Sequence, residues 1–537
     1  MNARLSLFWP ALVGLIYALT FAPGPLAAWA LPWVQIITLA ILAHWALTQS
    51  PRQAALTGLI FGTATYMCGL YWLTISMNVY GDLALPLAWI ALFLCSVFLA
   101  LYSAAAIWLT AWLLRQSRAG GPVAIIGRAS VWASAWSAAE MLRGILFTGF
   151  PWLATAYGQT EGWLAGFSVL FGATGVTWLT AWIAGAVALT LAAQASQPSE
   201  GFNTKRGAAL VIALLVAGLG AMLKDAEFSR PSGEPLTVRL VQGNVYQGLK
   251  FDPDIFEVAH QHHRDLAQHQ TDPGDPLDLD LILLPETIIA RLSNYVPQRH
   301  WQDWIDLADE TTSKVILGAP LYGPEPNRYT NSVILIEAST AISDLANASG
   351  ARYDKRHLVP FGEFVPRGFR WFIDLMQIPL GDFTAGEINQ PPFIVGTQKI
   401  AANICYEDIF GSELLPSVRS GATVLANFGN LGWFGDSFAL RQHWQMGRMR
   451  SMETRRPMVR ATNTGLTGAI DPFGQPIAVL PNYVAGYLDV RVQGHTGLTP
   501  YTRWGDWPVA VLVYGILLGA LIRRRLTTKH HRDTPAS

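Results

Sequence analysis

One cysteine in the C-terminal half of the sequence stands where a thiol could do chemistry. Cys405 ends the apolar run "AANIC" and is followed by "YED", and no other cysteine occurs after Cys95. A thiol is an effective nucleophile only when a neighbour takes its proton, because free cysteine has a pKa of about 8.5. The chain must therefore supply a base and a charge-stabilising group from other segments.

Two charged residues near the ends of other predicted strands can fill those roles. Glu286 follows the apolar run "LILL" in "LLPET", where a carboxylate is costly unless it is paired or functional. Lys355 is a fixed cation in "YDKRHLVPFGEF". A glutamate could move the thiol proton, a lysine could stabilise an oxyanion, and Cys405 could hold an acyl group as a thioester. Taken singly, Glu286 could also be a cap or surface residue, and Lys355 could be solvated.

The elements that would position these residues read as strands buried on both faces. Six runs rich in Val, Ile and Leu are predicted as strands: 236–245, 279–287, 314–321, 331–338, 399–407 and 422–430. Helical periodicity lies between some of them, with Ile255, Ala259, His262 and Leu266 on one helical face. Continuous apolar strands separated by helices predict a layered α/β domain.

The rest of the chain has the composition of a membrane protein. The full chain is 51% hydrophobic and 14% charged, against about 25% charged in an ordinary soluble domain. A spanning helix needs about 20 apolar residues. Seven apolar runs and a weaker one that contains Arg128 and Glu140 together predict eight spans: 5–22, 26–47, 54–76, 83–114, 122–142, 163–193, 207–223 and 507–522. We expect the first run to be a helix and not a cleaved signal peptide.

The distribution of basic residues predicts the orientation. Arg4, Arg52, Arg115 and the tail Arg523–Arg525 alternate with loops 22–29 and 76–83, which have no Lys or Arg. Both termini are therefore expected in the cytoplasm. The predicted organisation is a transmembrane domain over residues 1–223, an outer catalytic domain over residues 224–506, and a last span with a basic tail over residues 507–537. In a bacterium with two membranes the outer side is the periplasm. A net charge of zero gives no reason to expect a nucleic-acid partner.

The strand-end residues resemble the active site of the nitrilase, or carbon-nitrogen hydrolase, superfamily. Glu286 in "LLPET", Lys355 in "YDKRHLVPFGE" and Cys405 in "ICYED" match its Glu, Lys, Cys triad in order. With the flanking spans, essentially all of the chain resembles the apolipoprotein N-acyltransferase family, which completes bacterial lipoprotein maturation. The resemblance implies an αββα sandwich for the outer domain, with Glu286 as general base, Lys355 as oxyanion stabiliser and Cys405 as nucleophile.

The resemblance also implies roles for residues around the triad. Glu363 in "PFGEF" matches a second glutamate that supports the lysine and the substrate, and Tyr406 and Glu407 follow the nucleophile as the family pattern expects. The main-chain N–H of Tyr406 would be a second oxyanion donor. Trp152, in "TGFPW", is expected just outside the membrane beneath the active site. Phe251, in "GLKFDP", departs from the expected tryptophan, which keeps aromatic stacking but loses an indole hydrogen bond.

The implied reaction is a ping-pong acyl transfer. The acyl donor is expected to be a phospholipid of the bilayer, phosphatidylethanolamine, which gives up its sn-1 chain. The acceptor is expected to be the α-amino group of the N-terminal diacylglyceryl-cysteine of an apolipoprotein. The thioester carries the acyl energy, so no metal or other cofactor is expected.

Two other functions remain open. The same triad could serve a membrane-anchored amidase that uses water, or the chain could be a transporter in which Arg128 and Glu140 mark a pathway. The histidines of "HQHHRDLAQH" (His260, His262, His263, His269) are expected on a polar helix face and not at a metal.

Aromatic and basic segments of the outer domain also allow two interpretations. The loops 367–383 and 428–436 contain Trp371, Phe372, Leu375, Met376, Trp433 and Phe434. These side chains could pack in the core, or they could meet the bilayer interface or line an acyl-chain pocket. The basic run 441–460 is typical of a solvated helix, whereas the family resemblance implies that it lies in the carbon-nitrogen hydrolase core, and no substrate is assigned to it.

Overall fold

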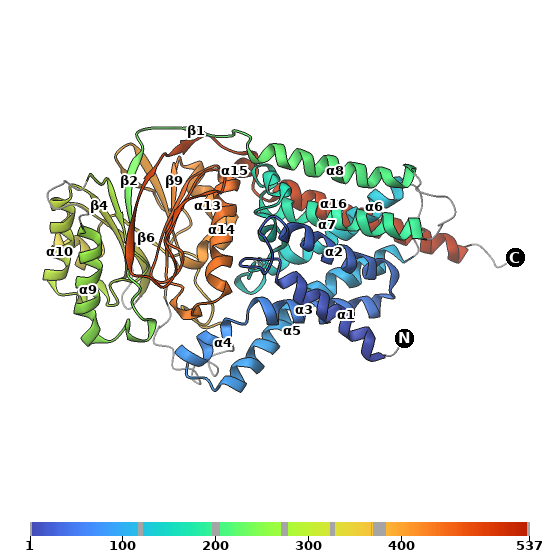
Figure 1. The fold of residues 1–537 in the computed structure, drawn as a ribbon, viewed down its shortest axis with the longest axis horizontal. Coiled ribbons are helices and arrows are strands. Elements are labelled where there is room, and N and C mark those ends of the chain that lie inside the picture. Colours follow the sequence, from blue (N-terminus) through green and yellow to red (C-terminus); the bar gives the residue numbers. More distant parts are fainter. Residues whose placement is uncertain are drawn as a thin grey trace. The chain divides into compact units, whose positions relative to one another are not determined.

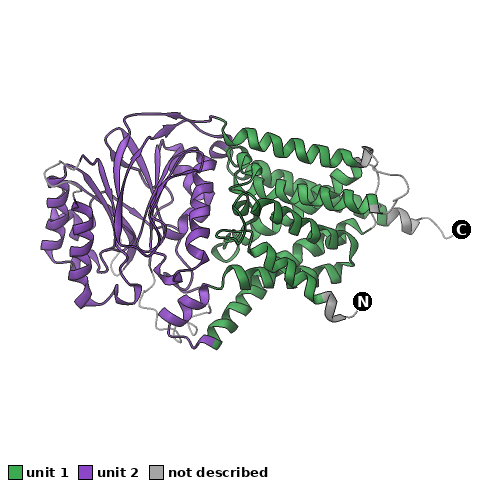
Figure 2. Ribbon diagram, viewed as in Figure 1, with its two compact units in different colours: residues 1–71, 86–226, 504–537 green, residues 72–85, 227–503 purple. Residues whose placement is uncertain are grey.

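The chain forms two compact units, which are described separately. The computed structural model describes residues 3–115, 122–195, 204–269, 278–322, 328–366, 368 and 383–533. Unit 1 comprises Met1–Tyr71, Pro86–Ala226 and Trp504–Ser537, and unit 2 comprises Trp72–Leu85 and Glu227–Arg503 (Figure 2). The short segment Trp72–Leu85 therefore belongs with the C-terminal unit, although unit 1 precedes and follows it in sequence.

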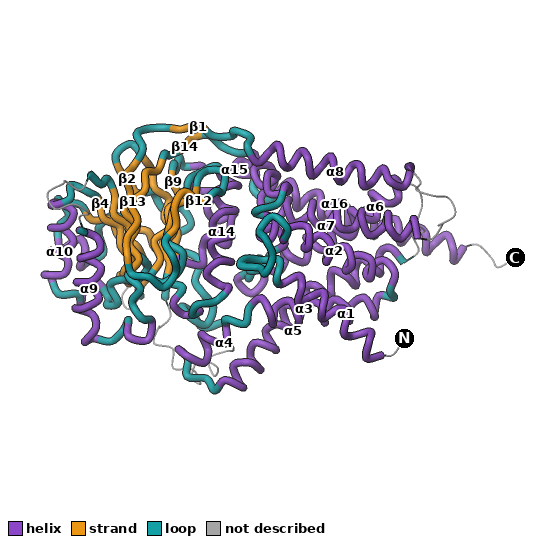
Figure 3. The backbone as a smooth tube through the Cα atoms, in the orientation of Figure 1, coloured by secondary structure: helices purple, strands orange, loops and turns teal. Residues whose placement is uncertain are grey.

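Unit 2 is built on two six-stranded sheets within its described residues (Figures 1 and 3). The first has the order β13-β2-β3-β4-β5-β6, with bounds Gly486–Val492, Leu236–Gln242, Leu281–Leu283, Lys314–Tyr322, Tyr329–Ile336 and Arg352–Asp354. The second has the order β12-β11-β10-β9-β8-β7, with bounds Pro476–Val479, Gly468–Ile470, Met458–Thr462, Val424–Gly429, Gln398–Ile404 and Phe393–Val395. Two short strands, β1 (Arg230–Pro231) and β14 (His495–Thr496), pair separately.

Helices cover the outer face of each sheet. Helices α9 (Pro253–Gln268) and α10 (Gln298–Glu310) pack on the first sheet, and α13 (Gly411–Arg419) and α14 (Phe438–Thr454) pack on the second (Figure 1). A third apolar cluster joins the inner faces of the two sheets. The predicted layered α/β domain is therefore confirmed as an α/β/β/α sandwich.

Strand β3 shows why the sequence reads as an unbroken apolar run. Leu281 and Leu283 pack into the core between the sheets, while Ile282 packs under the outer helices. Successive side chains of a strand point to opposite faces, so a strand covered on both sides must be apolar at every position.

Strand directions bring several strand ends to one edge of the sandwich. Strands β2, β3 and β4 are mutually parallel, and so are β8, β9 and β10. Strand β6 pairs antiparallel with β5, which pairs antiparallel with β4, so β6 runs in the same direction as β3. The carboxyl ends of β3 and β6 therefore lie at the same edge of the first sheet.

The basic helix α14 is buried and not solvated. Apart from the exposed Arg441, its residues from Ala439 to Thr454 are buried. Arg450 pairs through Nε with Glu453 at 3.0 Å, and Arg460 of β10 forms an ion pair with Asp408. The segment therefore lies in the core, as the family resemblance implies, and the alternative of a solvated helix is wrong. Burial of Arg450 and Arg460 is tolerable because buried carboxylates neutralise them.

Unit 1 is helical. Its longer helices are α1 (Ala3–Ala18), α2 (Leu31–Thr48), α3 (Pro51–Gly69), α5 (Leu85–Leu114), α6 (Pro122–Arg143), α7 (Ser168–Ala195), α8 (Thr204–Lys224) and α16 (Trp507–Asp533). Among the described residues, four helices are long and apolar enough to cross a membrane, in α2, α5, α7 and α8. A fifth candidate joins α3 to Leu73–Tyr80 across a bend of 61°. The helical region thus has four or five candidate spans, and the other predicted spans fall in α1, α6 and α16.

The charges of α6 are engaged by a neighbouring loop of unit 1. Glu140 accepts hydrogen bonds from the hydroxyls of Thr155 and Thr177 at 2.7 and 3.2 Å. Arg143 donates to the carbonyl oxygens of Phe150 and Trp152, both at 2.6 Å. The Arg143 contacts hold the "TGFPW" loop against α6, and the Glu140 contacts join α6 to Thr155 and to α7. Glu140 thus has a structural explanation that needs no transport pathway.

A close backbone contact next to Glu286 gives a test of the fold. A Cβ added to Gly318 of β4 would overlap Thr287 N and lie 2.7 Å from Glu286 Cα. We expect Gly318→Ala to lower the free energy of unfolding by about 1–3 kcal/mol, because the backbone must move apart. Thermal unfolding of the full chain in detergent measures this. Gly486→Ala on β13 is the matched control, since a Cβ there meets nothing within 4 Å. Equal effects of the two substitutions would contradict the prediction.

Candidate active site

The structure brings Glu286, Lys355 and Glu363 together in a buried cluster. Lys355 Nζ lies 3.2 Å from Glu286 Oε1 and 2.8 Å from Glu363 Oε1. The side-chain amide of Asn331 donates to the same two oxygens, each at 2.7 Å. The ammonium group and the amide therefore fix both carboxylates, although these carboxylates come from segments far apart in the sequence.

Strand ends deliver these side chains. Lys355 directly follows β6, and its N–H donates to the Asn331 carbonyl of β5 at 2.7 Å. Glu286 lies three residues beyond β3, and Val359 N holds the second oxygen of Glu363 at 2.8 Å. Among the described residues Glu286 Oε2 accepts no hydrogen bond. That oxygen is therefore open to a further hydrogen bond.

The ammonium of Lys355 is stabilised in its charged form. The side chain is 1% exposed. Burial alone would lower its pKa, but the carboxylates of Glu286 and Glu363 outweigh burial, and the pKa is raised above its ordinary value. Lys355 is thus a permanent cation in this site, and the interpretation of Lys355 as a solvated surface residue is wrong.

Cys405 lies at a strained turn directly after β8. Its φ is +52°, and it begins the 3-10 turn Cys405–Ile409. Its carbonyl oxygen accepts hydrogen bonds from Asn427 Nδ2 and His443 Nε2, both at 3.1 Å. A left-handed conformation costs about 1–2 kcal/mol in a residue with a Cβ. These two donors help to hold the backbone that aims the thiol.

The environment of the sulfur opposes the thiolate in the resting state. Burial and the charge of Glu286 raise the pKa of the Cys405 thiol, whereas Lys355 and the main-chain N–H of Asn430 lower it. The net pKa is well above its usual range, so the thiol is protonated at rest. The sulfur interacts electrostatically with Glu286, Lys355 and Glu363, which places it in the same site as the buried cluster.

Glu407 ties the cysteine turn to the lysine segment. Its Oε2 accepts from Ile404 N at 2.6 Å, and its Oε1 accepts from Arg356 N at 2.7 Å and His357 N at 3.1 Å. Tyr353 donates its hydroxyl at 3.1 Å. One carboxyl therefore connects the end of β8 with the segment after β6, so that Cys405 and Lys355 keep a fixed separation.

The aromatic residues of loop 428–436 pack within unit 2. Phe434 packs on Trp72 with tilted rings whose centroids are 4.4 Å apart, and Trp433 meets Tyr80 edge to face at 5.6 Å. Trp72 also donates from Nε1 to Gln442 at 3.3 Å. Both Trp433 and Phe434 are half-buried, as is Phe251. These two side chains thus fit the core-packing alternative in part, because they pack against the short segment Trp72–Leu85.

The remaining predicted contacts lie elsewhere. Trp152 is buried in unit 1, whereas Cys405 belongs to unit 2. Tyr406 is buried next to Cys405 in the chain, with its ring near His357 and Phe410. Trp371, Phe372, Leu375 and Met376 lie outside the described residues.

The histidines of α9 do not form a metal site in the described part of the chain. His260 and His263 are buried, so a polar helix face does not account for them. His260 pairs with Asp303 at 3.0 Å, His263 Nδ1 lies 2.7 Å from the Ala259 carbonyl, and His262 lies 2.9 Å from the Gly243 carbonyl.

Sequence reasoning missed several residues of the site. Asn331 stands at the start of the predicted strand 331–338, where an amide in an apolar strand was a usable signal. Asn427 and His443, which hold the Cys405 carbonyl, lie in segments assigned to a strand and to a basic helix. Lys250 donates from Nζ to the Glu286 carbonyl at 2.9 Å, and its only signal was its place in "GLKFDP".

Comparison with known sequences assigns the class of both regions of the chain. Residues 237–501 match the family described as "Carbon-nitrogen hydrolase", and residues 13–186 match "Apolipoprotein N-acyltransferase N-terminal domain". The sandwich with its buried glutamate, lysine and cysteine is thus a nitrilase-like domain.

Full-length relatives define the family more closely. The chain is 46% identical over 531 residues to "Apolipoprotein N-acyltransferase" of Bordetella bronchiseptica, and the match covers 96% of each chain. It is 39% identical over 538 residues to the enzyme of the same name from Ralstonia nicotianae, covering 97% of this chain and 95% of the relative. The chain belongs to the apolipoprotein N-acyltransferase family and is an acyltransferase with membrane helices.

Among solved structures, the chain is similar to a member of branch 10 of the nitrilase superfamily from Saccharomyces cerevisiae. The TM-score is 0.34 at 15% identity, and the match covers 50% of this chain and 92% of that one.

The strained turn at Cys405 can be tested with two variants that both lack sulfur. Alanine keeps a Cβ at φ +52°, whereas glycine adopts this conformation freely. We expect Cys405→Gly to be more stable than Cys405→Ala by about 1 kcal/mol. Thermal unfolding of both variants measures the difference. A more stable alanine variant would show that the turn carries no such strain.

Glu407 should make stability depend on pH. Burial raises the pKa of its carboxyl to about 7, although hydrogen bonds from Ile404 N and His357 N oppose the rise. The folded protein holds this proton up to about pH 7, whereas the unfolded chain releases it near pH 4.5. The unfolded state binds fewer protons in that window, so the contribution of Glu407 to the unfolding free energy falls as pH rises, by up to about 1.4 kcal/mol per unit.

We therefore expect the unfolding free energy of Glu407→Gln, whose side chain cannot titrate, to lack this decrease with rising pH. The measurement is the melting temperature of the wild type and the variant at about pH 5 and about pH 7.5. The gap between the two proteins should change between those values in favour of the variant at the higher pH. A gap that is the same at both pH values would contradict the assignment.

Proposed function

We propose that this chain transfers the sn-1 acyl chain of a phospholipid to the α-amino group of the N-terminal diacylglyceryl-cysteine of apolipoproteins, through a thioester on Cys405. The observation that carries the proposal is the buried ammonium of Lys355, which lies between Glu286 and Glu363 and interacts electrostatically with Cys405. A permanent cation, a carboxylate with one oxygen open and a thiol are the groups that acyl transfer needs.

In the first half-reaction Glu286 takes the proton from the Cys405 thiol. The thiolate attacks the carbonyl carbon of the sn-1 ester, and the new C–S bond gives a tetrahedral oxyanion. The bond from this carbon to the glycerol oxygen then breaks, and Glu286 returns the proton to that oxygen. The lysophospholipid departs, and the acyl group stays on the sulfur as a thioester. The expected donor is phosphatidylethanolamine.

In the second half-reaction the neutral α-amine of the acceptor attacks the thioester carbon. A C–N bond forms and the C–S bond breaks. Glu286 takes the proton that the attacking nitrogen loses and passes it to the sulfur, which restores the thiol. The balance needs no oxidant, nucleotide or metal, because the thioester already stores the acyl energy.

Lys355 is the proposed stabiliser of both oxyanions, with the main-chain N–H of Tyr406 as a second donor. Glu363 lies 2.8 Å from the Lys355 ammonium and holds it in place, and Asn331 donates a hydrogen bond to Glu363. The charge of Lys355 is therefore shared between two carboxylates and does not pair with Glu286 alone. Glu407 fixes the distance between the nucleophile and this cation through its three main-chain hydrogen bonds.

The membrane arrangement belongs to the same proposal. We infer eight spans, with a transmembrane domain over residues 1–223, a catalytic domain over residues 224–506 in the periplasm, and a final span and basic tail over residues 507–537, so that both termini lie in the cytoplasm of a bacterial cell. Support comes from the alternation of basic and neutral loops and from the helices found at each predicted span. Both lipid substrates resist leaving the bilayer, since each buried CH₂ is worth about 0.8 kcal/mol.

Four aromatic residues are proposed to contact the acyl chains or headgroups: Trp152, Phe251, Trp433 and Phe434. Three of them are half-buried in the catalytic unit, which leaves part of each ring surface for a lipid.

Mass spectrometry after incubation with phospholipid alone tests the thioester. We expect an acyl adduct on the peptide that contains Cys405, because no amine is present to remove it. Cys405→Ala should lose the adduct and the N-acylation of lipoprotein, while Cys95→Ala, which removes another free cysteine, should keep both.

Two results would contradict the proposal. Acyl transfer that survives in Cys405→Ala would remove the nucleophile. Absence of the adduct in the wild type, together with turnover of small amides, would favour a hydrolase that uses the same three residues.

A further inference from the structure

A second lysine lies beside the active site. Lys250 follows the 3-10 turn Gln247–Leu249 after β2, and its side chain is 8% exposed. Its Nζ donates to the carbonyl oxygen of Glu286 at 2.9 Å, the one acceptor for this ammonium among the described residues. A lysine buried this deeply is expensive unless its charge has a use.

The charge balance of the site shows that use. Glu286 and Glu363 share the single cation of Lys355, so two negative charges already face one positive charge. Transfer of the Cys405 proton to Glu286 keeps this total and moves one of the two negative charges onto the sulfur. Lys250 interacts electrostatically with both Glu286 and Cys405, and it supplies the further positive charge from a different element of the fold.

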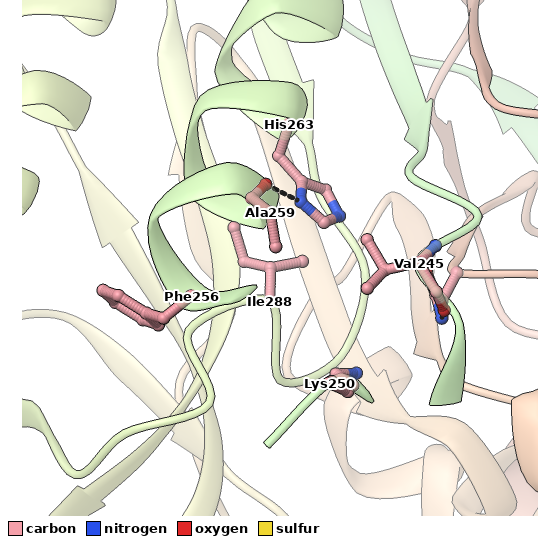
Figure 4. A pocket seen from close by; sticks show the side chains of 7 residues that line it. Val245, Lys250, Phe256, Ala259, His263 and Ile288 are labelled. Carbon is pink, nitrogen blue, oxygen red and sulfur yellow. Dashed lines mark hydrogen bonds between the residues drawn. The ribbon is translucent and has the colours of Figure 1, made fainter. Parts of the chain in front are cut away.

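The surroundings of Lys250 are compatible with a charged side chain. Lys250 and His263 line one small cavity together with Asn463 (Figure 4). His263 Nδ1 bonds the Ala259 carbonyl, so Nδ1 carries the hydrogen and Nε2 is an acceptor without a partner in the described residues. Burial lowers the pKa of His263 to about 4, so the ring is neutral and does not repel the ammonium.

The backbone held by Lys250 is constrained from the other side as well. The residue after Glu286, Thr287, has φ +53°, and Gly318 of β4 packs directly against this turn. The Lys250 hydrogen bond fixes the carbonyl that links Glu286 to the strained residue. Without it, the carboxyl group would be less restricted.

We propose that Lys250 is a positioning residue for the acyl-transfer site, which fixes the Glu286 main chain and stabilises the negative charge formed on Cys405. The inference rests on the proposed function for the identity of the nucleophile. It adds a second cation to the site, which holds Glu286 by its main chain while Lys355 and Asn331 hold its carboxylate.

The charge of Lys250 should change the pH dependence of thiolate formation on Cys405. The titratable groups that face Lys250 are Glu286, Cys405 and His263, and His263 stays neutral near neutral pH. Burial lowers the pKa of Lys250 to about 8, while Glu286 and Cys405 oppose this shift. The ammonium is therefore present at pH 7 and is lost as pH rises past about 8.

Alkylation of Cys405 by iodoacetamide in the full-length protein in detergent measures thiolate formation without lipid. In Lys250→Met we expect Cys405 to react about tenfold more slowly at pH 7, where the wild-type ammonium is present, and the difference to shrink as pH rises past about 8. Cys68 and Cys95, quantified in the same digest, should keep their rates. Lys399→Met, which removes an exposed lysine of β8, is the matched control. An unchanged Cys405 profile in Lys250→Met overturns the proposal.

Lys250→Arg keeps the test decisive if the methionine variant fails to fold. Arginine keeps its charge at high pH, so the ratio of its alkylation rate to that of the wild type should increase between about pH 7 and about pH 9.5. A constant ratio would overturn the proposal. Failure of the proposed function is distinguishable, because absence of an acyl adduct with phospholipid leaves the alkylation result standing.

Discussion

The buried ammonium of Lys355 is the interaction on which the catalytic unit depends. A cation that is 1% exposed is tolerable only with closely placed counter-charges, and Glu286 and Glu363 provide them. Those carboxylates can reach it only because the segments after β3 and β6 leave the same edge of one sheet. The apolar layers on both faces of that sheet are therefore what makes an ion cluster possible, since they fix the strands without using the polar groups of the site.

The cysteine is brought to this cluster by the other sheet, which makes its placement a separate problem. Cys405 is positioned by a strained turn. Hydrogen bonds to the Cys405 carbonyl and to the Glu407 carboxyl group hold this turn in place. Of the two donors to the Cys405 carbonyl, His443 is held in turn by a buried ion pair, because it lies 2.8 Å from Arg460 and 2.7 Å from Asp408. Polar residues of the basic run 441–460, His443 on α14 and Arg460 on β10, are thus buried supports of the Cys405 turn.

The sequence was sufficient to predict the layered domain and to place Glu286, Lys355 and Cys405 at strand ends, because apolar strands and the residues after them are local signals. It was insufficient for residues whose role depends on what lies opposite. Asn331 is an ordinary strand residue until two carboxylates meet at its amide, and Lys250 is one more charge in a polar loop until its Nζ reaches Glu286. The burial of His260, His263 and α14 likewise follows from packing partners, which periodicity along one segment does not reveal.

The excursion Trp72–Leu85 has a practical consequence for dividing this protein. Trp72 and Tyr80 pack against Phe434 and Trp433. A fragment that begins near Glu227, where the chain returns to unit 2, would lack Trp72–Leu85 and leave these two aromatic rings without their neighbours. The catalytic half is therefore not a contiguous piece of polypeptide, and any attempt to graft it onto another anchor has to carry that short insertion along.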